Sequence, residues 1–115
     1  MYNKRVNRDR NHQEIVQGLV KLGFSVLDLA AVGSGCPDIL VGITADDGTK
    51  YNVLMEIKSD KGKLRPEQKS FIENWNGSTC VVRTLAEAEF IAIYYKTLSK
   101  VTLEKTPLGL RQLGT

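Results

Sequence analysis

Apolar residues recur along the first 30 residues at two different spacings, and each spacing predicts a different element. Between Asn11 and Leu22 they recur every three or four residues, as on one face of a helix, with Asn11 as the N-cap and Gly23 as the terminating residue. From Phe24 to Ala30 apolar and polar residues alternate, which is the period of a strand. The pattern therefore predicts a helix that leads into a strand.

A hairpin is predicted in the middle of the chain. The apolar run 37–43 predicts one strand, and the run 51–58 predicts its returning partner. Between the two runs, Asp47 and Gly48 form a dipeptide that is typical of a tight turn between antiparallel strands. We therefore expect the two strands to pair with each other in antiparallel orientation.

The second half of the chain adds a helix, a strand and a helix. Pro66 stands at a first-turn position, where its missing N–H costs nothing, and predicts a helix that ends near Trp75. Residues 79–84 are rich in strand-forming types, whereas residues 85–98 are rich in helix formers. Residues 99–115 fit an added strand, a short helix or a partner-binding arm.

This order of elements predicts an α/β fold with a central mixed sheet flanked by helices. No internal repeat or linker interrupts the 115 residues, so we expect a single domain over 1–115. With 42% hydrophobic and 25% charged residues, the composition excludes a disordered chain or a disulfide scaffold. The apolar runs are too short to span a bilayer, so no membrane partner is expected. Cys36 and Cys80 are expected to be reduced, which favours the cytoplasm.

The positive charge is concentrated at one end of the chain. The net charge is +3, and the first ten residues hold four basic side chains against one acidic side chain. The other 105 residues hold twelve of each sign, so the whole excess lies in residues 1–10. These residues fit either a basic arm that contacts phosphate groups or a solvated terminus.

Two acidic residues mark one end of the predicted hairpin. Asp38 ends the segment Gly35-Cys36-Pro37-Asp38 at the start of the first strand, and Glu56 lies near the end of the second strand. Because the strands are antiparallel, both carboxylates lie at the same end of the sheet. Two carboxylates that leave positions for water and a phosphate oxygen suit Mg²⁺ or Mn²⁺.

A lysine is expected beside this pair of carboxylates. Side chains alternate along a strand, so Lys58 and Glu56 lie on the same face. An ammonium group at that place can position an attacking water or stabilise charge on a phosphate. The pattern therefore predicts metal-dependent hydrolysis of a phosphodiester by in-line attack of water.

These positions together resemble the PD-(D/E)XK nuclease superfamily, whose pattern is Gly-x-Pro-Asp, then Glu-x-Lys on the next strand, then a Gly and a helical Gln. The segment from Glu56 to Gln68, which contains Lys58 and Gly62, is most similar to the virus-type replication-repair nuclease branch, abbreviated VRR-NUC. The resemblance extends over about residues 11–84 and includes five spaced positions. It implies a restriction-endonuclease-like core.

The resemblance also implies which residues form the site. It implies five catalytic residues: Glu14, Asp38, Glu56, Lys58 and Gln68. The metal ligands would be Asp38, Glu56 and the backbone carbonyl of Ile57, with Glu14 acting directly or through water, and Lys58 would be the catalytic lysine. The glutamine would help to hold the site or the substrate.

The resemblance implies DNA as the substrate. Standalone members of the branch are small phage or bacterial proteins that act as homodimers on branched DNA, such as four-way Holliday junctions, with Mg²⁺ or Mn²⁺. Residues 91–95 and the tail are the expected dimer interface. The candidate DNA-binding residues come from the basic arm and from the loop and helix after Lys58: Arg5, Arg8, Arg10, Lys61, Lys63, Arg65 and Lys69.

Other interpretations remain open at this point. Each acidic residue has a structural alternative: Glu14 as a solvated helical residue, Asp38 as a turn residue and Glu56 as half of a surface charge pair with Lys58. The chain could then be a non-catalytic nucleic-acid-binding module on the same fold, or an assembly protein that binds no metal. Metal binding and cleavage of DNA distinguish these classes.

Overall fold

The computed structural model describes the backbone of residues 4–98, 102–106 and 109–113, and the side chains of residues 10–98. Three helices and six strands occur among these residues. In chain order they are α1 (Lys4–Lys21), β1 (Ser25–Asp28), β2 (Ile39–Thr44), β3 (Lys50–Ile57), α2 (Pro66–Asn74), β4 (Thr79–Val82), α3 (Leu85–Thr97), β5 (Thr102–Thr106) and β6 (Gly109–Leu113).

The first four strands form one mixed sheet in the order β1-β2-β3-β4. The β1–β2 and β2–β3 pairs are antiparallel, and β4 runs parallel to β3. In the central hairpin Thr44 pairs with Lys50 across the predicted turn, and Ile39 pairs with Met55 at the other end. The predicted α/β fold with a central mixed sheet is confirmed.

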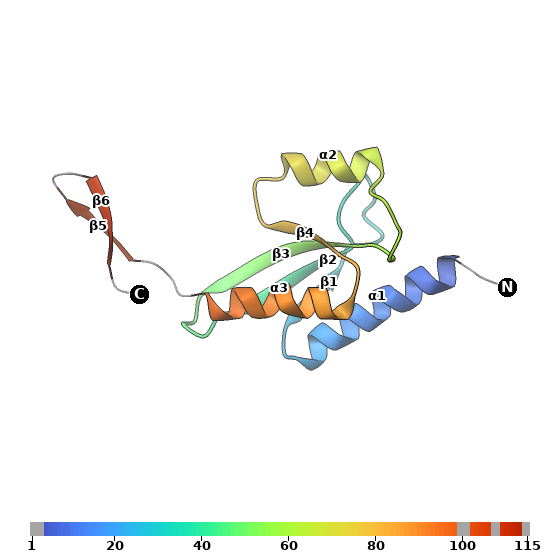
Figure 1. Cartoon of the computed structure of the whole chain (residues 1–115), viewed down its shortest axis with the longest axis horizontal. Coiled ribbons are helices and arrows are strands. Elements are labelled where there is room, and N and C mark those ends of the chain that lie inside the picture. Colours follow the sequence, from blue (N-terminus) through green and yellow to red (C-terminus); the bar gives the residue numbers. More distant parts are fainter. Residues whose placement is uncertain (1–3, 99–101, 107–108, 114–115) are drawn as a thin grey trace.

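Two helices cover one face of the sheet, and α2 lies on the opposite side (Figure 1). Ile15 and Leu19 of α1 and Ala88 and Ala92 of α3 are fully buried. They pack in one core with apolar side chains of the sheet. The sheet contributes to this core Ile39, Val41, Ile43, Val53, Met55, Ile57 and Val82, and Phe24 joins it from the segment before β1.

The alternation along β3 determines where the site forms. Met55 and Ile57 belong to the core beneath α1 and α3, whereas Glu56 bonds to a residue of α2 on the other side. The residues on both faces of this half of β3 are buried. The strand therefore delivers a carboxylate into a covered position between the sheet and α2.

The first helix differs from the sequence prediction. Helix α1 begins at Lys4, seven residues before the predicted start at Asn11. Residues 4–10 contain good helix formers and no Gly or Pro, but they carry no apolar stripe, so apolar spacing alone missed them. The predicted N-cap role of Asn11 is therefore wrong, and at least residues 4–10 of the basic arm belong to a helix.

The structure also describes part of the tail and the expected dimer interface at residues 91–95. The described part of the tail is extended, as the strand alternative expected, but it forms two strands, β5 and β6, in an antiparallel sheet separate from the central one. Within residues 91–95, Ala92 is fully buried in the core, and only Ile93 and Tyr94 have about half of their surface exposed. The expectation that the whole segment forms a dimer surface is therefore wrong for Ala92.

No helix of the described residues has the length and apolar character needed to cross a membrane.

Candidate active site

Asp38 stands where the chain enters β2. Pro37 before it is fully buried, and the backbone carbonyl of Asp38 accepts a hydrogen bond from Leu29 N at 2.7 Å. Its carboxylate oxygen Oδ2 accepts a second bond from Ile57 N, also at 2.7 Å. The carboxylate at the start of β2 is thus bonded to the end of β3, as expected for an antiparallel pair of strands.

Glu56 is the buried acid of the site, with only 2% of its surface exposed. Its Oε1 atom lies 3.6 Å from the ammonium nitrogen of Lys58, whose side chain is 15% exposed. A charge so far removed from water is costly unless it has partners. The surface-pair alternative for Glu56 and Lys58 therefore does not describe this arrangement.

The proximity of two acids changes the acidity of Glu56. The pKa of this carboxyl is raised from 4.5 to about 7, first by burial and then by the neighbouring Asp38, which acts by repulsion and through a hydrogen bond between the two side chains. The ammonium group of Lys58 acts in the opposite direction and lowers the pKa. The two carboxylates therefore lie close enough to destabilise each other's charge, which is the situation that a bound cation relieves.

Gln68 is the third side chain that reaches Glu56. It is 6% exposed, and its Nε2 donates to Glu56 Oε1 at 2.9 Å. Its Oε1 accepts from Arg65 N at 2.9 Å, at the N-terminal end of α2. Both ends of the amide are therefore used, and the start of α2 is tied to the carboxylate on β3.

The loop before Asp38 allows α2 to come this close. Gly33, Ser34 and Gly35 all have positive φ values, of 76°, 56° and 78°. Gly35 is buried, and a Cβ atom built on it would lie 2.4 Å from the carbonyl oxygen of Glu67. The absence of a side chain at Gly35 therefore lets the loop pass the first turn of α2, next to Gln68.

We expect Gly35→Ala to damage both stability and activity. The new methyl group overlaps backbone atoms of α2 and occupies a left-handed conformation, so the free energy of unfolding should fall by about 2 kcal/mol or more. Gly33→Ala is the matched control, because a Cβ there meets nothing within 4 Å although φ is also positive. Chemical denaturation of the two variants measures their losses of stability, and equal losses would show that the contact with α2 is unimportant.

Glu14 is not brought into this cluster. Its side chain is exposed on α1. Within residues 10–98, no group of three or more His, Cys, Asp and Glu side chains is arranged to hold a metal ion. Asp38 and Glu56 therefore stand as a pair, and a role of Glu14 stays a prediction.

The backbone of Ile57 adds an oxygen to this pair. The N–H of a residue in a strand lies on the same edge as its carbonyl. Since Ile57 N donates to Asp38, the Ile57 carbonyl faces that edge too, beyond the last pairing of β3 with β2. Two carboxylates and a backbone carbonyl fit Mg²⁺, which is commonly bound through one or two carboxylates together with water and substrate phosphate.

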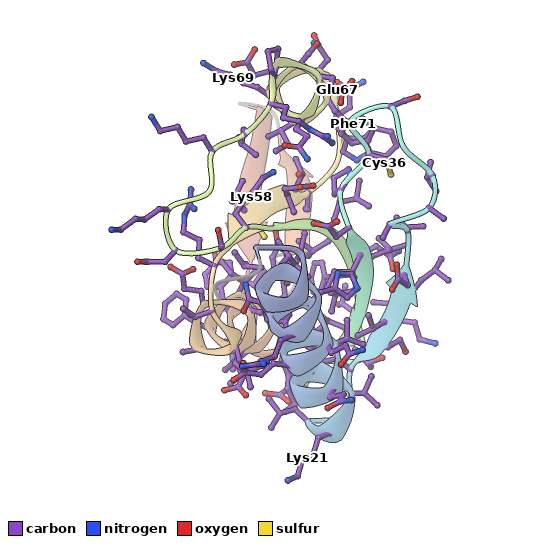
Figure 2. The ribbon with its side chains drawn as sticks, turned by 90° about the vertical axis from the view of Figure 1, so that its right-hand side faces the viewer. Lys21, Cys36, Lys58, Glu67, Lys69 and Phe71 are labelled. Carbon is purple, nitrogen blue, oxygen red and sulfur yellow. The ribbon has the colours of Figure 1, made fainter. Side chains whose placement is uncertain are left out.

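Five of the seven candidate DNA-binding residues have described side chains, and all five are exposed. Lys61, Lys63, Arg65 and Lys69 are exposed in the loop before α2 and on that helix, and Arg10 is exposed on α1. Arg65 has one acidic neighbour, with Nη2 3.5 Å from Glu67 Oε1. Figure 2 shows Lys69 at the end of the molecule opposite to Lys21, with Lys58 between them. The side chains of Arg5 and Arg8 lie outside the described residues.

Arg83, at the end of β4, organises this basic loop and was not identified from the sequence. Its Nη1 donates to the carbonyl oxygens of Ser59 at 2.7 Å and Gly62 at 2.6 Å, with Asp60 O at 3.5 Å. Asn11 of α1 joins the same region, since its Nδ2 donates to Lys58 O at 3.2 Å and Arg83 O at 3.3 Å. No sequence motif pairs these residues, because the contacts join segments far apart in the chain.

We predict that Arg83→Gln weakens DNA binding without removing any DNA-contacting cation from the loop. The carbonyls of Ser59 and Gly62 lose a charged donor, so the loop no longer holds its lysines in one arrangement. We expect about a threefold to tenfold weaker affinity at low salt, measured by fluorescence anisotropy with labelled duplex. Lys50→Gln is the control for loss of one positive charge, and an equal loss in both variants would contradict the positioning role.

Comparison with known proteins identifies the family and the fold. A family model described as the VRR-NUC domain matches residues 3–86, which include β1 to β4 and the whole candidate site. The chain belongs to the VRR-NUC domain family, a family of nuclease-type domains. A solved structure titled "VRR_NUC domain" is similar to it, with a TM-score of 0.59 and 22% identity over 76% of this chain and 96% of that chain, which shows the shared fold. No curated protein matches the sequence.

Proposed function

We propose that this protein is a Mg²⁺- or Mn²⁺-dependent DNA endonuclease that hydrolyses phosphodiester bonds in an active site formed by Asp38, Glu56 and Lys58. The observation that carries the proposal is the group formed at one end of the sheet by the buried Glu56 and Gln68 and the partly buried Asp38 and Lys58. A module that only binds a polyanion has no evident use for two carboxylates that repel each other, with the Lys58 ammonium nitrogen 3.6 Å from Glu56 Oε1.

Asp38, Glu56 and the Ile57 carbonyl are the proposed metal ligands. A divalent cation held there supplies charge neutralisation for a phosphate and increases the acidity of water. Gln68 keeps Glu56 oriented through its amide, and Ile57 N keeps Asp38 oriented. Glu14, exposed on α1, is proposed to support the metal directly or through water.

Lys58 is the proposed catalytic lysine. Its ammonium group lies on the same face of β3 as the Glu56 carboxylate, and most of its side chain is buried. At that place it holds the attacking water and offsets negative charge that develops on the phosphate. Burial strengthens this effect, because fewer water molecules screen the charge.

The exposed cations extend the site into a DNA-binding surface. Lys61, Lys63, Arg65 and Lys69 are exposed in the loop after Lys58 and on α2, and Arg5, Arg8 and Arg10 occupy the first turns of α1. They offset the repulsion between the acidic site and the DNA backbone. We propose branched DNA, such as a four-way junction, as the substrate and a homodimer as the active form, because two symmetric sites can cut two strands.

Cleavage of a matched set of DNA molecules tests this function. The purified protein is incubated with a labelled four-way junction, a flap, a fork and a linear duplex that share one arm, in Mg²⁺, in Mn²⁺ and in EDTA. We expect the branched molecules to be cut in either metal and none to be cut in EDTA. Equal rates on all four molecules would contradict the branched substrate, and no cleavage of any would contradict the nuclease function.

A further inference from the structure

An apolar groove lies beside the candidate metal site and has no part in the function described so far. It has a volume of about 580 Å³ and lies between the loop before Asp38, the outer face of β2 and β3, and the end of α2. Its walls include Leu40, Leu54, Phe71 and Trp75, and its rim includes Asn52 and Cys36. This volume lies within the range of small-molecule pockets and admits a group of the size of a nucleotide.

The aromatic wall of the groove is organised in advance. The rings of Phe71 and Trp75 are stacked, with centroids 5.2 Å apart and an angle of 13° between their planes. A Cβ atom on Gly77 would lie 2.9 Å from Trp75 Nε1, so the backbone of Gly77 borders the indole on another side. Trp75 nevertheless has half of its surface exposed. A fixed, half-exposed indole is a platform for a flat ligand, with little ordering to be done on binding.

The groove continues directly into the metal site. Leu54 lines it and lies two residues before Glu56 on the same face of β3, which places the two positions about 7 Å apart. Cys36 lines it from the other side and lies two residues before Asp38. Burial and the charges of Glu56 and Asp38 raise the pKa of Cys36, which agrees with this proximity. Figure 2 shows Cys36 and Phe71 on the same side of α2.

We propose that this groove binds one unstacked nucleobase of the substrate strand, stacked on Trp75, while the adjoining phosphodiester lies at Asp38 and Glu56. Leu54 in the groove and Glu56 in the metal site are only about 7 Å apart along β3, so a base in the groove and a nearby phosphate of the same strand reach both places. Stacking needs no particular base, because every base has an aromatic face. This proposal rests on the proposed nuclease function and specifies an unpaired or distorted position as the part of the substrate that is recognised.

The single tryptophan of the chain gives a direct measurement. Trp75 emission is recorded during titration with an eight-nucleotide single strand in low salt and EDTA, where no cleavage is expected, and anisotropy of a label on the DNA measures its binding. The control ligand is the same strand with reduced abasic residues, which keeps every phosphate and removes the bases. We expect the normal strand to quench Trp75 by at least half at saturation and the abasic strand to leave its emission unchanged.

Variants separate stacking from charge. Trp75→Ala should weaken binding of the single strand by about 5- to 150-fold, which corresponds to the loss of one stacked base, whereas Trp75→Phe should remain within about threefold of the wild type. Phe90→Ala is the matched control, because Phe90 is 72% exposed on α3 and does not line the groove. Binding of a fully paired duplex should be the same in all of these proteins. Circular dichroism and thermal unfolding establish that each variant is folded.

Three results would overturn the proposal. The first is DNA that is bound, as anisotropy shows, without quenching of Trp75. The second is equal quenching by normal and abasic strands. The third is a shift of Trp75 emission with protein concentration alone, together with dimerisation in sedimentation and no further response to DNA, which would assign the groove to a second copy.

Failure of this proposal is distinguishable from failure of the nuclease function. If the wild type cuts DNA while Trp75 does not respond, the groove proposal is wrong and the nuclease function stands. If Trp75 responds to bases but no DNA is cut in Mg²⁺ or Mn²⁺, the base site stands and the hydrolytic function is wrong.

Discussion

Lys58→Met is expected to lower the rate of DNA cleavage by at least about 100-fold. Lys58 carries the ammonium group 3.6 Å from Glu56 Oε1, in a position with 15% exposure, and a buried charge directed at the reacting phosphate is worth two to three powers of ten in rate. Methionine has a similar length and no charge, so the packing of the side-chain stem is retained. Single-turnover cleavage with excess enzyme in Mg²⁺ measures the loss without interference from product release.

The control for Lys58→Met is the same substitution at Lys21. Lys21 is exposed at the C-terminal end of α1, well away from Lys58 in Figure 2. Its replacement should leave the rate within about twofold of the wild type. DNA binding by the Lys58 variant should weaken much less than its rate. A rate within tenfold of the wild type would contradict the assignment of Lys58 as the catalytic lysine.

Glu56→Gln is expected to abolish metal-dependent cleavage and, at the same time, to stabilise the metal-free protein at high pH. The glutamine oxygen still accepts the hydrogen bond from Gln68 Nε2, so the contact between β3 and α2 is retained. The negative charge needed to hold a divalent cation is removed, so we expect cleavage to fall by at least about 100-fold. Few substitutions at other positions should raise stability and remove activity together.

The sign of the stability effect follows from the acidity of Glu56. Its pKa is about 7 in the folded protein, raised by burial and by Asp38, against 4.5 for the unperturbed group. Between these values the folded state binds more protons than the unfolded state, so stability decreases as pH rises from about 4.5 to about 7. The ionised carboxylate then costs about 3 kcal/mol of stability at pH 8, in the absence of metal.

Urea denaturation in EDTA at several pH values measures this effect. The difference in free energy of unfolding between Glu56→Gln and the wild type should grow from pH 5 to pH 8 and remain level above pH 8. Mg²⁺ should stabilise the wild type at pH 8 and should not stabilise the variant, because a cation that binds the folded state favours it. A difference that does not depend on pH would show that Glu56 is not a buried acid of raised pKa.

The sequence was sufficient to place the chemical groups because three of them are encoded locally. Asp38 and Glu56 lie at the ends of two strands joined by a short turn, and Lys58 follows Glu56 at the period of a strand. Pairing of the two strands then leaves little freedom in where the carboxylates lie. Gln68 was found through the resemblance, and the structure adds the reason for its place, which is the pair of bonds to Glu56 and Arg65.

The features that the sequence did not reveal depend on contacts between distant segments. Arg83 binds carbonyls of a loop more than 20 residues away, and Asn11 reaches the ends of two strands from the middle of a helix. Asn11 was predicted as an N-cap because asparagine favours such positions when only local sequence is considered. The apolar groove was likewise hidden, since Leu40, Leu54 and Trp75 line one space only after folding.

The most direct test of the central claim measures metal binding and cleavage on the same samples of wild type and Asp38→Asn. Mn²⁺ is titrated into each protein at pH 8, its binding is followed by the loss of the free-ion signal in electron paramagnetic resonance, and labelled four-way junction is then added. If Asp38 and Glu56 hold the metal that supports hydrolysis, the wild type binds Mn²⁺ and cuts the junction. In Asp38→Asn the affinity for Mn²⁺ then falls by at least about tenfold and the rate of cleavage by at least about 100-fold. An Asp38→Asn protein that binds Mn²⁺ and cuts DNA as well as the wild type would contradict the claim.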